Sequence, residues 1–390
     1  MTLQKELSRH IHAGHPWIWR DALAHASLAT GAVVDVHDRG GRFVARGLWD
    51  ARSPLAVRVF TLDEDEALDG AMIRRRVADA LAARRGVIEF SGPAETNAFR
   101  MVNGEGDFLP GVVVDLYHDT AVVRFDGDAA RALEGDVVSA VVAAGRPLGL
   151  ARVYERSRGA KGKALFGGEP PAVVEIRERG VRFAVDVIHG QKTGTFLDQR
   201  DNRAAIRPWA AGVAVANLFS YTGGFSVHAA LAGARTVVSV DSAAPALASA
   251  RDNFALNGID PDAHRFECAD VFEWLARGKA ERRRFELMIV DPPSFAPSEK
   301  SVDKALAAYR DLFAESLALV APGGVLAAAS CSSHVDMEAF LGAIRDASAR
   351  ARRPLRILET RGQPGDHPTV PAFKEGRYLK FVLCRTRSET

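Results

Sequence analysis

An acid and two prolines directly follow an apolar run in the stretch FELMIVDPPSF, residues 285–295. Asp291 would place a carboxylate just beyond the end of a buried strand, where ligands of parallel sheets bind. Pro292 and Pro293 fix the backbone and lack N–H donors, so the chain after the acid forms a rigid, extended turn. We interpret this turn as a wall against which a planar substrate is positioned; the alternative is that DPP only ends a strand.

Three earlier apolar runs also end in residues that suit a nucleotide ligand. Gly223 and Gly224 allow a tight turn into a helix, whose first N–H groups face a ligand above it. Asp241 ends the second run and can accept hydrogen bonds from the two hydroxyls of a ribose. Asp270 ends the third run, and its carboxylate with the next backbone amide can read an adenine edge. The glycine loop lacks the GxGxxG spacing of a dehydrogenase.

Cys331 ends a fifth run, AAASCSS, and would lie at the same edge of the sheet, next to the cleft formed by the strand ends that suit a nucleotide cofactor. A lone cysteine is usually a small buried apolar residue. We expect that role for Cys268 and Cys384, which lie inside strand patterns. The three cysteines have no CxxC spacing, so the sequence predicts neither a metal site nor a disulfide framework.

One sheet must bring these strand ends together. From about Arg182 the sequence alternates strand and helix patterns, and the apolar runs are VAVANLF, RTVVSVD, HRFECAD, FELMIVD, GGVLAAASC, LRILET and YLKFVLC. This alternation predicts an α/β fold with a mostly parallel, doubly wound sheet and helices on both faces.

Two smaller parts precede this sheet. Short strands separated by turns (GAVVDVHD, RFVARGLWD and LAVRVFTL) predict a small β-barrel or sandwich. A helical pattern over residues 65–88 follows, which we interpret as a connector. The strands FRMV, GVVVDLY, AVVRF and ARVYERS and a helix around residues 129–144 then predict an α+β unit. The predicted division is 1–68, 69–180 and 181–390.

Composition sets the class of protein. A chain of 390 residues with 47% hydrophobic residues can build more than one core. The net charge of +2 does not by itself predict a polyanionic partner. Basic clusters in MIRRRVADALAARRG, ERRRF, ARARRP and YERSRGAKGKALF permit nucleic acid binding, although solvated helix faces explain each one as well. Without a signal-peptide pattern or a long apolar run, we expect a cytoplasmic protein without membrane attachment.

The motifs together resemble one family. FSYTGGFSVHA, VVSVD, DVF, VDPPSF and SCSS are similar to class I S-adenosyl-L-methionine-dependent methyltransferases of the large-subunit methyltransferase I type, which modify cytosine C5 in large-subunit ribosomal RNA. HGQKTGTFLDQRDNR resembles the segment before its cofactor domain, AGHPWIWRDAL the start of its RNA-binding PUA domain, a small β-barrel, and NGEGDFLPGVVVD its α+β middle domain. DHP and EGRYLKFVLC agree near the end. The resemblance implies a Rossmann-like methyltransferase domain with a seven-stranded, mostly parallel sheet.

The resemblance also implies site residues. It puts Phe219, Tyr221, Thr222, Gly223 and Gly224 around the methionine part of S-adenosyl-L-methionine. It puts Asp241 on the ribose and Asp270 with Val271 at the adenine, and Phe196, Asp198, Gln199 and Arg200 in the lining of the same cleft. The implied cofactor-binding residues are Gln199, Phe219, Tyr221, Thr222, Gly223, Gly224, Asp241, Ser242, Asp270, Val271 and Asp291. The implied substrate-binding residues are Pro292, Pro293 and Phe295.

By resemblance, Cys331 is a catalytic nucleophile. C5 of cytosine is poorly reactive until a thiolate adds at C6 and pushes electron density onto it. Asp291, the second catalytic residue, would hydrogen-bond the base at N3 or its exocyclic amine. Ser294 stands where some RNA cytosine methyltransferases have a second cysteine, so a one-cysteine mechanism is implied. His334 and Asp336 are candidates for the base that removes the C5 proton, although we expect Asp336 to cap a helix.

Two other functions stay open. Methyltransferases that act on amino groups use DPP followed by an aromatic residue, and here Ser294 intervenes before Phe295; guanine N7 is another target of similar enzymes. A non-catalytic RNA-binding assembly factor would lack cofactor affinity. The expected partner is large-subunit rRNA, free or in an assembly intermediate, at an unpaired or flipped base. Trp17 and Trp19 could stack on RNA, but we expect core packing. Formation of a homodimer stays open.

Overall fold

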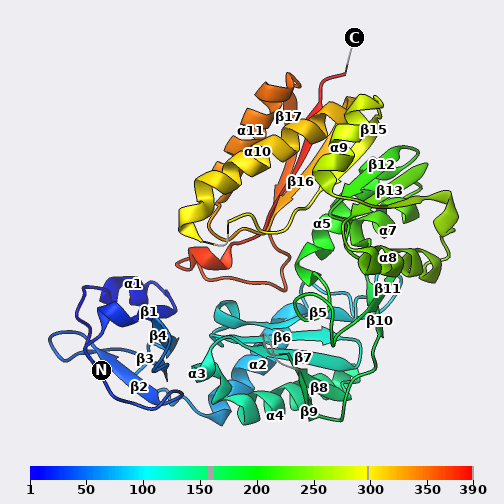
Figure 1. Ribbon diagram of the computed structural model, residues 1–390. Coiled ribbons are helices and arrows are strands. Elements are labelled where there is room, and N and C mark those ends of the chain that lie inside the picture. The colour runs from blue at the N-terminus through cyan, green and yellow to red at the C-terminus, as the bar shows by residue number, and fades with distance from the viewer. Residues whose placement is uncertain (157–161, 297, 389–390) are drawn as a thin grey trace. The chain divides into compact units, whose positions relative to one another are not determined.

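The computed structural model describes residues 1–156, 162–296 and 298–388 (Figure 1). The chain divides into two compact units. The first comprises Met1–Gly180, Val185–Leu197 and Gly365–Gly376, and the second comprises Val181–Ala184, Asp198–Pro364 and Arg377–Thr390. Within the basic stretch YERSRGAKGKALF, residues 157–161 lie outside the described part of the chain.

The first unit begins with a small β domain. Its elements are α1 (Ser8–His12), β1 (Trp17–Trp19), β2 (Val33–His37), β3 (Phe43–Trp49) and β4 (Leu55–Thr61). The strands form one antiparallel sheet in the order β1-β4-β3-β2, so three predicted strands are confirmed and β1 adds a fourth. Ile18, Val36 and Val57 belong to its core. The packing expectation is wrong for Trp19, which is 46% exposed.

An α+β part completes the first unit. Its elements are α2 (Gly70–Arg84), β5 (Ala98–Asn103), β6 (Val112–Tyr117), β7 (Thr120–Phe125), α3 (Asp128–Arg131), α4 (Glu134–Gly145), β8 (Arg152–Glu155), β9 (Lys163–Phe166) and β10 (Val174–Glu178). Strands β5 to β9 form a sheet in chain order, and the pairing of β7 with β8 is parallel. The single predicted helix is divided into α3 and α4, and acidic residues begin the second helix as the helix dipole favours.

Helix α2 is part of this core, so its interpretation as a connector is wrong. Met72, Ile73 and Val77 are buried in the same cluster as Phe99 and Val114 of the sheet. A helix with an apolar stripe must bury that stripe against a neighbour, and here α4 and β5 provide it.

The start of α2 provides a test of local stability. The Asp69 carboxylate accepts hydrogen bonds from the backbone N–H groups of Ala71 and Met72, both at 2.9 Å. We expect Asp69→Ala to lower the free energy of unfolding by about 1 kcal/mol, the usual effect of losing an N-cap. Urea denaturation followed by circular dichroism measures this loss. Asp79→Ala, at an exposed position within the same helix, is the control; an equal loss in both variants would contradict the capping role.

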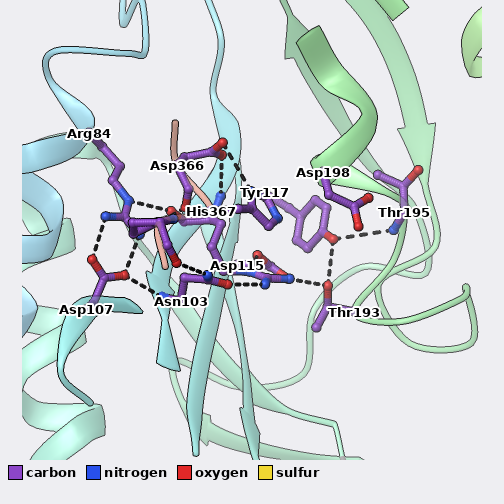
Figure 2. Close-up of polar contacts among 12 residues, drawn as sticks. Arg84, Asn103, Asp107, Asp115, Tyr117, Thr193, Thr195, Asp198, Asp366 and His367 are labelled. Carbon is purple, nitrogen blue, oxygen red and sulfur yellow. Dashed lines mark hydrogen bonds and ion pairs between the residues drawn. The ribbon is translucent and has the colours of Figure 1, made fainter. Parts of the chain in front are cut away.

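Charged side chains are buried where the segment Gly365–Gly376 returns to the first unit (Figure 2). Arg84 is 1% exposed and donates to the two carboxylate oxygens of Asp107 at 2.7 and 2.5 Å. The same guanidinium donates to the backbone carbonyl of Asp366 at 3.0 Å. The Asp366 carboxylate in turn accepts from the backbone N–H of Arg100 at 3.0 Å. The DHP motif thus anchors a distant piece of chain against β5.

The second unit contains the predicted α/β sheet. Its strands are β11 (Val181–Val185), β12 (Ala214–Leu218), β13 (Thr236–Asp241), β14 (Arg265–Cys268), β15 (Phe285–Val290), β16 (Val320–Ser330), β17 (Leu355–Arg361) and β18 (Lys380–Thr386). Its helices are α5 (Arg200–Ala205), α6 (Arg207–Ala210), α7 (Gly224–Leu231), α8 (Ala244–Leu256), α9 (Val271–Ala280), α10 (Val302–Leu319) and α11 (Met337–Ala351).

Seven of these strands form the sheet in the order β14-β13-β12-β15-β16-β18-β17. The five strands from β14 to β16 pair in parallel, and β18 is antiparallel to both of its neighbours. All seven predicted strands and the mostly parallel arrangement are therefore confirmed. The carboxyl ends of β12, β13, β14, β15 and β16 meet at one edge, where the candidate residues follow.

Helices cover both faces of this sheet, as predicted. On one face, α9, α10 and α11 pack against alternate strand residues, and Figure 1 shows α10 and α11 side by side. Leu218, Val290 and Val382 belong to this core. On the other face, Phe225 of α7 stacks on Phe381 of β18, with ring centroids 6.1 Å apart. Both faces of the central strands are buried, which explains their continuous apolar runs. Among the described residues, no helix is long and apolar enough to cross a membrane.

Candidate active site

The loop after β12 has a backbone that few residues adopt. Gly223 has a φ of 78°, and a Cβ there would lie 2.9 Å from the Cβ of Ala250, so glycine is required. Phe219 and Tyr221 also have positive φ angles, 57° and 48°. Left-handed non-glycine residues are costly and concentrate at functional sites. The predicted glycine turn is therefore present, and its strain is consistent with a ligand-binding loop.

Asp241 connects this loop to the end of β13. Its Oδ2 accepts a hydrogen bond from the backbone N–H of Tyr221 at 2.8 Å, and its Oδ1 accepts one from Ala243 at 2.9 Å. On the other side of the loop, the backbone carbonyl of Thr222 accepts from the Asn253 amide at 2.9 Å. A carboxylate has about four acceptor positions, so Asp241 keeps capacity for a ligand.

Asp270 follows β14 and caps α9. Its Oδ1 accepts from the backbone N–H groups of Phe272 at 2.9 Å and Glu273 at 3.1 Å. These two hydrogen bonds to Oδ1 fix the orientation of the whole carboxylate, including Oδ2. Val271 beside it is buried, whereas Ser242 after β13 is exposed.

Asp291, after β15, is oriented by Gln199. The Gln199 side-chain amide donates to Oδ2 of Asp291 at 2.9 Å, and its own oxygen accepts from Asn202 at 2.7 Å. Gln199 and Asn202 are fully buried, while Asp291 is half-buried. Gln199 and Asn202 therefore hold the carboxylate of the DPP turn in a fixed position. Phe196 of that segment belongs to the first unit, where the Lys192 ammonium lies 4.6 Å from its ring centre.

The DPP turn and the cysteine turn are hydrogen-bonded to each other. The hydroxyl oxygens of Ser294 and Ser332 lie 3.1 Å apart, and the backbone N–H of Ala296 donates to Ser332 Oγ at 3.3 Å. Pro292 is buried and Pro293 is exposed. The ring centroids of Phe295 and Tyr309 lie 4.9 Å apart. The structure therefore brings Asp291 and the half-buried Cys331 to adjacent strand ends, as the sequence predicts.

Two residues that the sequence analysis did not single out, Tyr309 and Lys380, support the cysteine turn. The Tyr309 hydroxyl lies 2.9 Å from the hydroxyls of both Ser330 and Ser332, the two neighbours of Cys331. Burial raises the pKa of Tyr309, so the phenol stays neutral. Lys380, at the start of β18, donates to the backbone carbonyl of Ser332.

Lys380 could have been found from the sequence, because it is a charged residue inside the apolar run YLKFVLC. Its side chain is 1% exposed and also donates to the backbone carbonyl of Tyr378 at 2.8 Å. Burial lowers the pKa of Lys380 to about 8. The hydroxyl of Tyr378 donates to Asp198 at 2.6 Å, which links Asp198 to the residues that precede β18.

The other candidates have different outcomes. Cys384 is buried as expected, and burial raises its pKa to about 12. The expectation for Cys268 is wrong, because β14 is an edge strand and its last residue is exposed. Asp336 caps α11 by accepting from the backbone N–H of Ala339 at 2.8 Å, as predicted. His334 is exposed.

Comparisons with known proteins agree with this arrangement. The family model described as S-adenosylmethionine-dependent methyltransferase matches residues 103–383, and a PUA-like domain model matches residues 1–62. The chain belongs to the S-adenosylmethionine-dependent methyltransferases. Curated relatives named Ribosomal RNA large subunit methyltransferase I include one from Alteromonas mediterranea, 34% identical over 100% of this chain and 99% of its own, and one from Shewanella denitrificans, 36% identical over 99% and 98%. The resemblance to the large-subunit methyltransferase I type is confirmed.

Solved structures show that the methyltransferase shares its fold with other members. A SAM-dependent methyltransferase from Streptococcus mutans has a TM-score of 0.86 at 23% identity, with 99% of each chain covered. A methyltransferase complexed with SAH has a TM-score of 0.88 at 24% identity, with the same coverage.

The residues of this methyltransferase fit its cofactor. The Ser220 hydroxyl and the Asn217 side-chain oxygen are buried beside the glycine loop and have no hydrogen-bond partner among the described residues. Asp241 and Asp270 supply carboxylates at adjacent strand ends, which suit ribose and adenine groups. Within the described chain, no group of three or more histidine, cysteine or acidic side chains could hold a metal ion.

Proposed function

We propose that this methyltransferase transfers a methyl group to C5 of a cytosine in large-subunit ribosomal RNA through a covalent adduct with Cys331. The observation that carries this proposal is the hydrogen-bonded pair of turns in which Ser294 and Ser332 join the acid and cysteine strand ends. The names of the curated relatives support ribosomal RNA as the substrate. The proposal also includes three domains, with boundaries after residues 68 and 180. It further includes a cytoplasmic location and a substrate that is either free rRNA or an assembly intermediate.

The chemistry starts at Cys331. Its thiolate forms a bond to C6 of cytosine, and the C5–C6 π electrons move onto C5, which becomes nucleophilic. S-adenosyl-L-methionine supplies a methyl group activated by its sulfonium charge. After C5 has taken that methyl group, a base removes the C5 proton, its electrons restore the double bond, and the C6–S bond breaks to return the thiolate.

Asp291 would hold the base during this sequence. A carboxylate accepts a hydrogen bond from the exocyclic amine of cytosine, the pairing that acidic side chains use when they read this base. Gln199 donates to Oδ2 of Asp291 and so fixes the orientation of the carboxylate before substrate arrives. Pro292, Pro293 and Phe295 then form a rigid surface next to the base.

An amino-group methyltransferase is the second candidate. In such enzymes an aromatic residue directly follows DPP, whereas here Ser294 stands between the prolines and Phe295. The Ser294 hydroxyl contacts Ser332, and the Phe295 ring packs against Tyr309. This departure favours the C5 reaction, which alone needs the nearby thiol.

The product decides between these functions. Purified protein is incubated with unmodified ribosomal RNA and methyl-labelled S-adenosyl-L-methionine, and nucleosides are analysed by mass spectrometry. We expect the label in 5-methylcytidine. Label in 7-methylguanosine or in an N-methylated nucleoside would overturn the cytosine assignment, and a protein that binds no cofactor would be an assembly factor.

A further inference from the structure

Lys380 is a buried lysine that forms no salt bridge with a carboxylate among the described residues. In the described part of the chain its ammonium forms no ion pair with a carboxylate and donates to two backbone carbonyls, those of Ser332 and Tyr378. A buried charge is costly unless another charge lies near it. Its position therefore needs an explanation other than ordinary packing.

The register of the sheet places this lysine beside the cysteine. Lys380 of β18 pairs with Ser330 of β16, and Cys331 is the next residue. Lys380 lies on the same face of β18 as Val382 and Cys384, the face covered by α10 and α11. Its contact with the carbonyl of Ser332 keeps the ammonium at the cysteine turn.

Few titratable groups surround Lys380. Burial lowers its pKa, while the charges of Cys331 and then Asp336 raise it. Asp336 is exposed and caps α11, and Tyr309 of α10 has a raised pKa and stays neutral. From the chain before β18, Tyr378 presents its carbonyl to the ammonium and its hydroxyl to Asp198. The first group of opposite charge that acts on Lys380 is therefore the half-buried Cys331, which carries such a charge only as a thiolate.

We propose that Lys380 is a positioning residue that holds Cys331 as a thiolate through an ammonium–thiolate pair. The inference rests on the proposed function, because it concerns the thiol that this function uses. The pair supplies the nucleophile without a separate base to deprotonate it.

The pair has a defined pH range. Lys380 keeps its positive charge below its pKa of about 8, so the thiolate is favoured at neutral pH. Above this pKa the ammonium is lost and the cysteine no longer gains from it. An ordinary thiol titrates near about 8.5, and a neighbouring lysine lowers that value.

Alkylation measures this effect without RNA or cofactor, so its outcome is independent of the product assay. The full chain is treated with iodoacetamide from pH 5 to 10, and mass spectrometry follows the peptide that contains Cys331. We expect a midpoint below about 8.5 in the wild type. In Lys380→Met the midpoint should rise by about one pH unit or more, a tenfold loss of thiolate per unit at neutral pH.

Two controls accompany the measurement. The exposed Cys268 is alkylated in the same samples and should keep its midpoint in every variant. Tyr309→Phe removes a neutral contact to the same turn and should leave the Cys331 midpoint in place, whereas a general loosening of the turn would shift it as well.

The proposal fails if Lys380→Met and the wild type have the same Cys331 midpoint. If the variant does not fold, the wild type alone decides, because a midpoint at or above about 8.5 contradicts a stabilised thiolate. A shifted midpoint together with a product other than 5-methylcytidine would keep the pair and reject the proposed function.

Discussion

Cys331→Ala is expected to abolish methyl transfer to cytosine while leaving cofactor binding unchanged. The loss in kcat should reach about 10⁴-fold or more, the scale on which enzymes lose activity when a covalent nucleophile is removed. Cys331 follows β16, whereas the glycine loop follows β12 and Asp241 ends β13, so the substitution leaves the residues of the cofactor site in place. Transfer of label to ribosomal RNA measures the first effect, and calorimetric titration with S-adenosyl-L-methionine measures the second.

A trapped adduct tests the covalent step directly. RNA that contains 5-fluorocytidine has no C5 proton to lose, so the methylated base should stay bonded to the cysteine. A complex that survives denaturing electrophoresis is expected for the wild type and for Cys268→Ala, which removes an exposed thiol on β14. It should be missing for Cys331→Ala. Methylation of cytosine at the wild-type rate by Cys331→Ala would exclude the adduct mechanism.

Much of the second unit could be predicted because its strands are buried on both faces. Such strands are continuous apolar runs, and the residue after each run lies at one known edge of the sheet. Gly223, Asp241 and Asp291 were found in this way. The hydrogen bonds that orient these residues are harder to predict from the sequence, because Gln199, which donates to Asp291, lies 92 residues away in the chain.

Contacts across strands and segments explain what could not be predicted. Lys380 meets the cysteine turn only because β18 inserts antiparallel beside β16. Cys268 was expected to be buried, but a strand pattern does not tell an edge strand from a central one. Likewise, the apolar stripe of α2 indicates that one face is buried, without indicating that α4 and β5 cover it.

Arg84→Met is expected to destabilise the first unit strongly. The guanidinium is 1% exposed and is bidentate to Asp107, so its removal leaves a buried carboxylate without its positively charged partner, although the backbone N–H of Asn103 still donates to it at 2.6 Å (Figure 2). Breaking a buried pair from one side typically costs about 3–5 kcal/mol. Two backbone carbonyls, those of Arg100 and Asp366, also lose their donor.

Hydrogen exchange on the full chain locates this loss. Amide protection should fall in peptides from α2 and β5 and stay constant in peptides from β15 and β16, because the pair lies in the first unit. Arg75→Met, which removes an exposed partner of Glu66, is the matched control and should change stability by less than about 0.5 kcal/mol.

The double variant Arg84→Met, Asp107→Asn separates charge from packing. If the uncompensated carboxylate causes the damage, neutralising Asp107 should recover part of the protection that Arg84→Met loses. The protection that is not recovered is then due to the lost hydrogen bonds from Arg84 to the carbonyls of Arg100 and Asp366. These bonds, with the one from Arg100 N–H to the Asp366 carboxylate, hold the DHP segment against β5. Equal protection in Arg84→Met and Arg75→Met would show that the buried pair does not stabilise this unit.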